Sequence, residues 1–209
     1  MTTLSALAQS LRASMIGVAD EFDREPERGS LAQFQRLLQV ALDDYSRRRP
    51  LIVLGRLQLE AERVVYDCPA DLVAVQAFDW GRADKARLPV WADGWPGRLP
   101  DMRVSRDGDR RVLYLMPAPS ARQIGLLGSA ASYRYRARHT LDEQGSTIPA
   151  GDEPLVLLRA QAEAMRELSI SNTIKPFQVR DGISATPRNG TPSYLHTVLM
   201  EEFERRICQ

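Results

Sequence analysis

The spacing of apolar residues changes twice along this chain, and each change marks a switch of secondary structure. Up to residue 50 they recur every three or four positions, which is the period of an amphipathic helix. From residue 51 to about residue 141 they alternate with polar residues, as in half-buried strands. From residue 152 the helical period returns. This order predicts an α+β fold, with an α-helical core and an antiparallel β-domain inserted between its N- and C-terminal helices.

Two helices are predicted before residue 50. The first lies within the first twenty residues and places Leu4, Leu7, Leu11 and Met15 on one face. The second begins at Ser30, which can form a capping box with Gln33. Its apolar stripe consists of Leu31, Phe34, Leu37, Leu38, Ala41, Leu42 and Tyr45. Pro50 ends this helix because the residue before a proline disfavours helical geometry.

The middle of the chain predicts a series of short strands. They fall near residues 51–59, 64–66, 72–80, 102–106, 111–116, 124–127 and 132–139. Asp107 and Gly108 separate two of these strands and are typical of a tight hairpin turn. In the last strand, buried and exposed faces alternate, so Tyr133, Tyr135 and Ala137 form one face and Arg134, Arg136 and Arg138 the other.

Two further helices are predicted after the strands. One covers residues 152–171, with Ala162 and Met165 in its buried seam, and the other runs from Thr191 to Arg206. The apolar face of the last helix consists of Leu195, Val198, Leu199, Phe203 and Ile207. Residues 174–190 lack periodicity and are expected to form either an extended arm or a loop that folds back onto its own domain. The predicted domains are an N-terminal helical part of the core at 1–50, the inserted β-domain at 51–141, a core helix at 142–173, and the C-terminal arm and helix at 174–209.

The chemistry-bearing residues form no motif that would indicate catalysis. The two histidines lack metal-binding spacing, Cys68 and Cys208 lie far apart, and no nucleophile elbow or phosphate-binding glycine loop is present. No apolar run reaches the roughly 20 residues that span a bilayer, and the N-terminus does not resemble a secretion signal. We therefore expect no enzyme activity, no catalytic residue, no cofactor, no metal and no membrane partner.

Charge is distributed unevenly along the chain. Residues 98–140 carry nine basic and three acidic side chains, whereas the segments on both sides are slightly acidic. This asymmetry indicates either a surface facing nucleic acid or an acidic protein, or a solvated arginine-rich sheet face. Tryptophan and arginine are enriched in interfaces. The candidate subunit-interface residues are therefore Trp91, Trp95, Arg134, Arg136 and Arg138, whereas Trp80 is expected in the core.

Three segments resemble the head–tail connector (adaptor) proteins of long-tailed bacteriophages. They are the strand from Tyr133 to His139 (Tyr-Arg-Tyr-Arg-Ala-Arg-His), the turn Ser-Thr-Ile-Pro at 146–149, and the helix at 154–171. The stretch 34–50, with Tyr45 and Ser46 shortly before Pro50, also resembles the first core helix of that family. The order of elements matches along nearly the whole chain.

The resemblance implies a structural role in the virion neck, with assembly in the host cytoplasm. Such proteins form a homo-oligomeric ring, typically of about twelve subunits, that docks on the portal protein, surrounds the DNA channel without reading sequence, and receives the next neck or tail protein. The helices at 30–45 and 154–171 would build the ring core, and residues 174–209 would contact the portal. The candidate contact residues are Phe177, Tyr194, Leu195, Leu199 and Phe203.

Three alternatives stay open at this point. Within the same viral setting, a tail-terminator or stopper neck protein has a similar size and composition. Outside it, the arginine face could belong to a non-viral nucleic-acid-binding α+β module. The third alternative is an enzyme whose catalytic residues are dispersed along the sequence.

Overall fold

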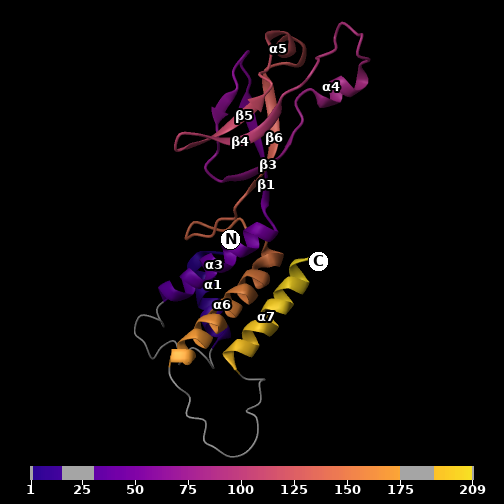
Figure 1. Ribbon diagram of the computed structural model, residues 1–209. Coiled ribbons are helices and arrows are strands. Elements are labelled where there is room, and N and C mark those ends of the chain that lie inside the picture. Colours follow the sequence, from indigo (N-terminus) through magenta and orange to yellow (C-terminus); the bar gives the residue numbers. More distant parts are fainter. Residues whose placement is uncertain (1, 16–30, 175–190, 209) are drawn as a thin grey trace, which may run out of the picture. The chain divides into compact units, whose positions relative to one another are not determined.

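The structure is a computed structural model that describes residues 2–15, 31–174 and 191–208. These residues form six α-helices, one short 3-10 helix and two three-stranded antiparallel sheets (Figure 1), which confirms the α+β class. The chain divides into two compact units. The helical unit comprises residues 1–49 and 139–209, and the β-unit comprises residues 50–138. The β-unit is therefore an insertion between two segments of the helical unit.

The helical unit is built from α1 (Leu4–Ser14), α3 (Leu31–Arg48), α6 (Glu153–Ile174) and α7 (Pro192–Ile207). α6 contacts both α3 and α7, and α6 and α7 lie side by side (Figure 1). The predicted stripe of α3 is buried from Phe34 to Tyr45, and Ala162 and Met165 are buried in α6 as predicted. Thr191 caps α7 through its side-chain oxygen, and Pro192 occupies the first turn, where its missing N–H is not needed.

The structure corrects the expectation of a C-terminal arm that is separate from the core. α7 packs on α6, and Phe203 is fully buried in the helical core with the Arg48 guanidinium 5.4 Å from the centre of its ring. Val198 was expected on the buried face but is exposed, because the contact face of α7 runs through Leu195, Leu199 and Phe203. Residues 175–190, including Phe177, lie outside the described part of the chain.

Polar contacts close the helical unit at the point where the chain leaves it and returns. The Arg49 guanidinium binds the Asp152 carboxylate at 3.1 Å and donates to the Ile207 carbonyl oxygen at 3.0 Å. The His139 backbone N–H donates to Ser46 Oγ at 3.1 Å, and its ring Nε2 lies 3.0 Å from the Arg49 carbonyl oxygen. These contacts join the end of α3 to the segment that leads into α6 and to the end of α7.

The β-unit contains two antiparallel sheets. Sheet A has the order β1 (Leu51–Gln58), β6 (Ala130–Ala137) and β3 (Leu72–Phe78). Sheet B has the order β2 (Val65–Asp67), β5 (Arg110–Met116) and β4 (Asp101–Asp107). In the central strand β6, buried and exposed residues alternate without exception, so the predicted aromatic and arginine faces are confirmed. Trp80 is buried, and its ring N–H donates to the Gly128 carbonyl oxygen at 3.1 Å.

Two local predictions in the β-unit are wrong. Residues 124–127 belong to a helix, α5 (Ala121–Leu127), because Ser120 and Gln123 form a reciprocal capping box at its start. In the β4–β5 hairpin, Asp107 pairs with Arg110, so the two loop residues are Gly108 and Asp109 rather than Asp107 and Gly108. Of these two loop residues only Gly108 has positive φ, and glycine tolerates this at the first loop position.

A partly buried ionic network joins α3 to α6. The Arg159 guanidinium donates to the Asp44 carboxylate at 2.7 Å and to the Glu163 carboxylate at 3.1 Å, and Arg166 also binds Glu163. Only 3% of the Glu163 side chain is exposed. Burial acts to raise the pKa values of both carboxyls. The arginine hydrogen bonds and charges outweigh this effect, so both pKa values lie below their usual range.

This network predicts that acid destabilises the helical unit. Both carboxyls have lower pKa values folded than unfolded, so their contribution is present above about pH 5 and is lost as pH falls through about 4 and below. Arg159→Met should weaken this pH dependence and cost up to about 3 kcal/mol at neutral pH. Arg36→Met, which removes an exposed pair with Glu167, should cost less than about 1 kcal/mol. Urea unfolding between pH 3 and 8 measures both effects, and equal costs for the two variants would contradict the role of the network.

A close approach in sheet A gives a second test. Gly55 of β1 pairs with Tyr133 of β6, and a Cβ at position 55 would overlap the Tyr133 ring, which is buried. Gly55→Ala should therefore lower the unfolding free energy of the β-unit by about 1–3 kcal/mol. Gly125→Ala is the matched control, because a Cβ there meets nothing within 4 Å in α5, and alanine favours a helix. Thermal unfolding should separate the two variants, and a Gly55→Ala protein as stable as the parent would refute this packing.

Candidate interaction surfaces

The first candidate surface is a short apolar loop of the β-unit, which we call the Trp91 tip (residues 88–91). Trp91 has 87% of its surface exposed, and Val90 has 69%. Leu88 and Pro89 next to them are also exposed. The tip follows α4 (Arg82–Arg87), a helix within the stretch expected to be a long loop, and α4 lies to one side of the strands in Figure 1. A tryptophan with so much exposed surface is unusual for a folded protein without a partner.

The Trp91 tip stands on a loop that is held in place by α5. The buried Gln123 side chain donates to the carbonyl oxygens of Pro96 and Arg98, both at 2.8 Å. Arg122 donates to the Asp93 carbonyl oxygen at 2.8 Å. These contacts fix the segment that follows the tip, so Trp91 is presented on an anchored loop.

Trp95 differs from Trp91 although both were candidates for an interface. Trp95 is half-buried, and the Lys85 ammonium lies 5.1 Å from the centre of its ring, within the range of a cation–π contact. Trp95 therefore packs within the α4 segment, and Trp91 is the tryptophan whose ring faces solvent.

The second candidate surface is the open face of sheet A. Its exposed members include Ile52, Leu54, Arg56 and Gln58 of β1, Val73 of β3, and Ser132, Arg134 and Arg136 of β6. Ile52 pairs with Arg136 and Leu54 with Arg134, so aliphatic side chains lie directly beside arginines. Leu54 is 60% exposed, and Ile52 and Val73 are 48% exposed. Aliphatic and basic side chains together suit contact with another protein surface better than contact with water.

The arginines of this face differ in their contacts. The Arg134 guanidinium forms an ion pair with Asp79 at 3.2 Å. Arg56 and Arg136 have no ion-pair partner among the residues that the structure describes, and no hydrogen bond of their side chains is present there. Arg138 is exposed just beyond the end of β6. The three predicted arginines therefore share the exposed side, with Arg136 the best placed to meet an external carboxylate.

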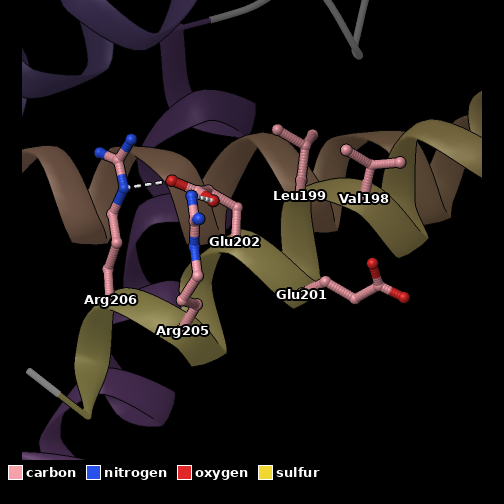
Figure 2. Close-up of a pocket in the computed structure, with 6 residues that line it drawn as sticks. All are labelled: Val198, Leu199, Glu201, Glu202, Arg205 and Arg206. Atoms are coloured by element: carbon pink, nitrogen blue, oxygen red, sulfur yellow. Dashed lines mark hydrogen bonds and ion pairs between the residues drawn. The ribbon is translucent and has the colours of Figure 1, made fainter.

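The third candidate surface is the outer stripe of α7, formed by Tyr194, Val198, Glu201 and Arg205. These residues are spaced three or four positions apart and are all exposed. A shallow hollow on α7 is lined by Val198, Leu199, Glu201, Glu202, Arg205 and Arg206. Figure 2 shows Glu202 bound by Arg205 and Arg206, whereas the Glu201 carboxylate points away from both. The stripe thus combines apolar surface with the Glu201 carboxylate, which neither of these arginines binds.

The predicted contact residues of α7 differ in how far they are exposed. Leu195 and Leu199 are half-buried and pack against the helical core, and Leu199 also reaches the hollow. Tyr194 is 41% exposed on the outer stripe. Phe203 is buried and offers no surface to a partner, so its expected contact role is corrected by the helix packing.

Two titratable side chains of the β-unit, Cys68 and Tyr133, have raised pKa values. Burial raises the pKa of the Cys68 thiol, and it outweighs the opposing effect of the Arg111 charge. Burial likewise raises the pKa of Tyr133 to about 12, with Tyr135 adding to the effect. Both groups are therefore protonated at neutral pH. Tyr133 packs on the inner face of sheet A, and Cys68, which follows β2 of sheet B, is partly buried against the core of the β-unit.

Two other kinds of site, a metal site and a membrane-spanning helix, are absent from the part of the chain that the structure covers. In residues 2–15, 31–174 and 191–208, no group of three or more His, Cys, Asp or Glu side chains is placed to hold a metal ion. Among the same residues, no helix combines the length and apolarity needed to cross a bilayer.

No protein-family description matches the chain, and no curated protein matches it significantly.

Sequence reasoning missed several members of these surfaces. Ile52 and Leu54 could have been found, because alternation in β1 puts them on the face opposite Leu51 and Val53. The exposure of Val90 could not have been predicted, because apolar periodicity does not show which side chains of an irregular loop face solvent.

Proposed function

We propose that this protein is a non-catalytic assembly subunit that forms a ring and joins two other components. The observation that supports this best is the placement of exposed apolar side chains on both units of the chain. On the β-unit they include Ile52, Leu54, Val73, Val90 and Trp91, and on the helical unit Ile170, Tyr194 and Val198. A subunit that contacts both its neighbours and separate partners needs several such surfaces.

The specific identity that we propose is a head–tail connector, or adaptor, in the neck of a long-tailed bacteriophage. The support is the resemblance carried by residues 34–50, 133–139, 146–149 and 154–171 together with the order of the elements. In this proposal the partners are further copies of the chain, the portal protein, and the next neck or tail protein, with DNA passing through the channel. The helical unit supplies the rigid core of the ring.

Two surfaces are assigned to outside partners in this proposal. The start of α7, with the exposed Tyr194, is assigned to the portal side because the C-terminal region has that role in the proteins that the chain resembles. The Trp91 tip is assigned to the next neck or tail protein. An exposed tryptophan on an anchored loop can fill an apolar pocket with little loss of side-chain entropy, which is typical of interface hot spots.

Native mass spectrometry tests the ring directly. The purified chain is measured alone and with the portal protein encoded in the same genome, and we expect a closed ring of about twelve copies that binds the portal. A chain that stays monomeric with the portal would overturn the connector proposal. DNA binding by such a monomer that weakens steeply with salt would instead favour the nucleic-acid-binding module.

The Trp91 tip gives a sharper prediction. Trp91→Ala should leave the melting temperature unchanged because the ring is almost fully solvated in the free chain. It should weaken attachment of the next neck or tail protein by about 2 kcal/mol or more, roughly thirtyfold. Met116→Ala is the matched control, since Met116 is also exposed in the β-unit but outside the tip. Pull-down of tails by filled heads measures the effect, and equal attachment by both variants would remove the tip from the interface.

A further inference from the structure

The open face of sheet A and the outer stripe of α7 have complementary side chains. The sheet face presents Ile52 and Leu54 beside Arg136, which has no ion-pair partner among the described residues. The stripe presents Val198 beside Glu201, whose carboxylate points away from the nearby arginines (Figure 2). Each face therefore offers exposed aliphatic surface beside charge of opposite sign to the other, from arginines on the sheet face and from Glu201 on the stripe.

The net charges of the two units have the same signs as the charges on their two faces. The β-unit, residues 50–138, has 14 basic and 10 acidic side chains, a net charge of +4. The helical unit, residues 1–49 and 139–209, has 14 basic and 17 acidic side chains, a net charge of −3. Opposite net charges on the two units favour encounters in which the β-unit of one molecule meets the helical unit of another.

The side chains of the sheet face favour a protein occupant over nucleic acid. Single-stranded nucleic acid binds basic sheets through aromatic rings that stack on bases. In sheet A the aromatic residues Tyr133 and Tyr135 lie on the inner face and are buried. The open face carries aliphatic rather than aromatic side chains beside its arginines. Aliphatic side chains release free energy when they are buried against other aliphatic surface.

We propose that the open face of sheet A in one copy docks on the part of the outer α7 stripe around Val198 and Glu201 in a second copy of the chain, which leaves Tyr194 at the start of α7 to the portal side. The two faces are different surfaces, so the contact is heterologous, and each copy still offers one face of each kind. Repetition of such a contact closes into a ring when the rotation between copies permits it. The inference rests on the proposed ring-forming function and names the surfaces that hold the ring together.

A charge exchange tests the pairing. Arg136→Glu and Glu201→Arg should each weaken self-association about tenfold, because an attraction becomes a repulsion. A chain that carries both substitutions should associate within about twofold of the parent, since the charges again match. Arg106→Glu, an exposed arginine of sheet B, is the control and should leave association unchanged. Sedimentation velocity across a concentration series measures all four variants, and single variants that associate like the parent would overturn the proposal, as would a double variant that stays as weak as the singles.

Mixing two variants tests the head-to-tail geometry. Leu54→Asp damages only the sheet face, and Val198→Asp damages only the stripe; both sites are exposed, so both chains should fold. Alone, each variant has no intact pair of faces and should be monomeric. Mixed, they retain one intact pairing and should form dimers and nothing larger. Monomers only, or higher oligomers, in the mixture would refute the pairing.

The outcomes separate this inference from the proposed function. If Arg136→Glu and Glu201→Arg both form rings that bind the portal, the named contact is wrong and the connector role is unaffected. If the parent chain forms no ring and binds no portal, the connector role itself fails.

Discussion

The helical unit depends on contacts that bring Arg49 back to the second half of the chain. Its helices come from two segments separated in sequence by the entire β-unit, so the core exists only when residues 49 and 139 meet. Closing such an insertion costs chain entropy, which rises slowly with loop length. The Arg49–Asp152 ion pair, the contact of His139 with the Arg49 carbonyl group and the link from Arg49 to the end of α7 offset that cost at one place. Burial and the hydrogen bond to Asp152 raise the pKa of Tyr45 beside them, as expected for a neutral, well-packed group.

Among the residues that the structure describes, the buried cluster of the helical unit contains no residue of the β-unit. The β-unit has its own buried cluster, which includes Leu113, Leu115, Phe78 and Trp80. Because these residues form its core, the unit can present other apolar side chains at its surface, on the open face of sheet A and at the Trp91 tip. Exposed apolar surface of this kind is unfavourable in water for a monomer, but it is common where a protein contacts a partner. The assembly role that we propose uses these surfaces. The opposite net charges of the two units favour contacts between the β-unit of one copy and the helical unit of the next.

Residue patterns could predict the regular elements because burial acts on them with a fixed period. The stripe of α3, the seam of α6 and the alternation in β6 all follow from that effect. The prediction failed where one local contact decides between alternatives. Ile124 and Leu127 suit a strand by composition, but the capping box of Ser120 and Gln123 starts a helix instead. Val198 lies close to the edge of the apolar face of α7, and the packing of α7 on α6 leaves its side chain exposed.

The sequence by itself determined the α+β class, the insertion of strands between helices, and the opposite faces of the arginines and tyrosines in β6. These depend on the period of apolar residues, which is a local property of the chain. The tertiary structure alone decided that α7 belongs to the helical core, that Phe203 is buried and Val198 exposed, and that Trp91 faces solvent while Trp95 packs against Lys85. The physical reason is that exposure depends on what lies opposite a side chain, and its neighbours there come from distant parts of the sequence.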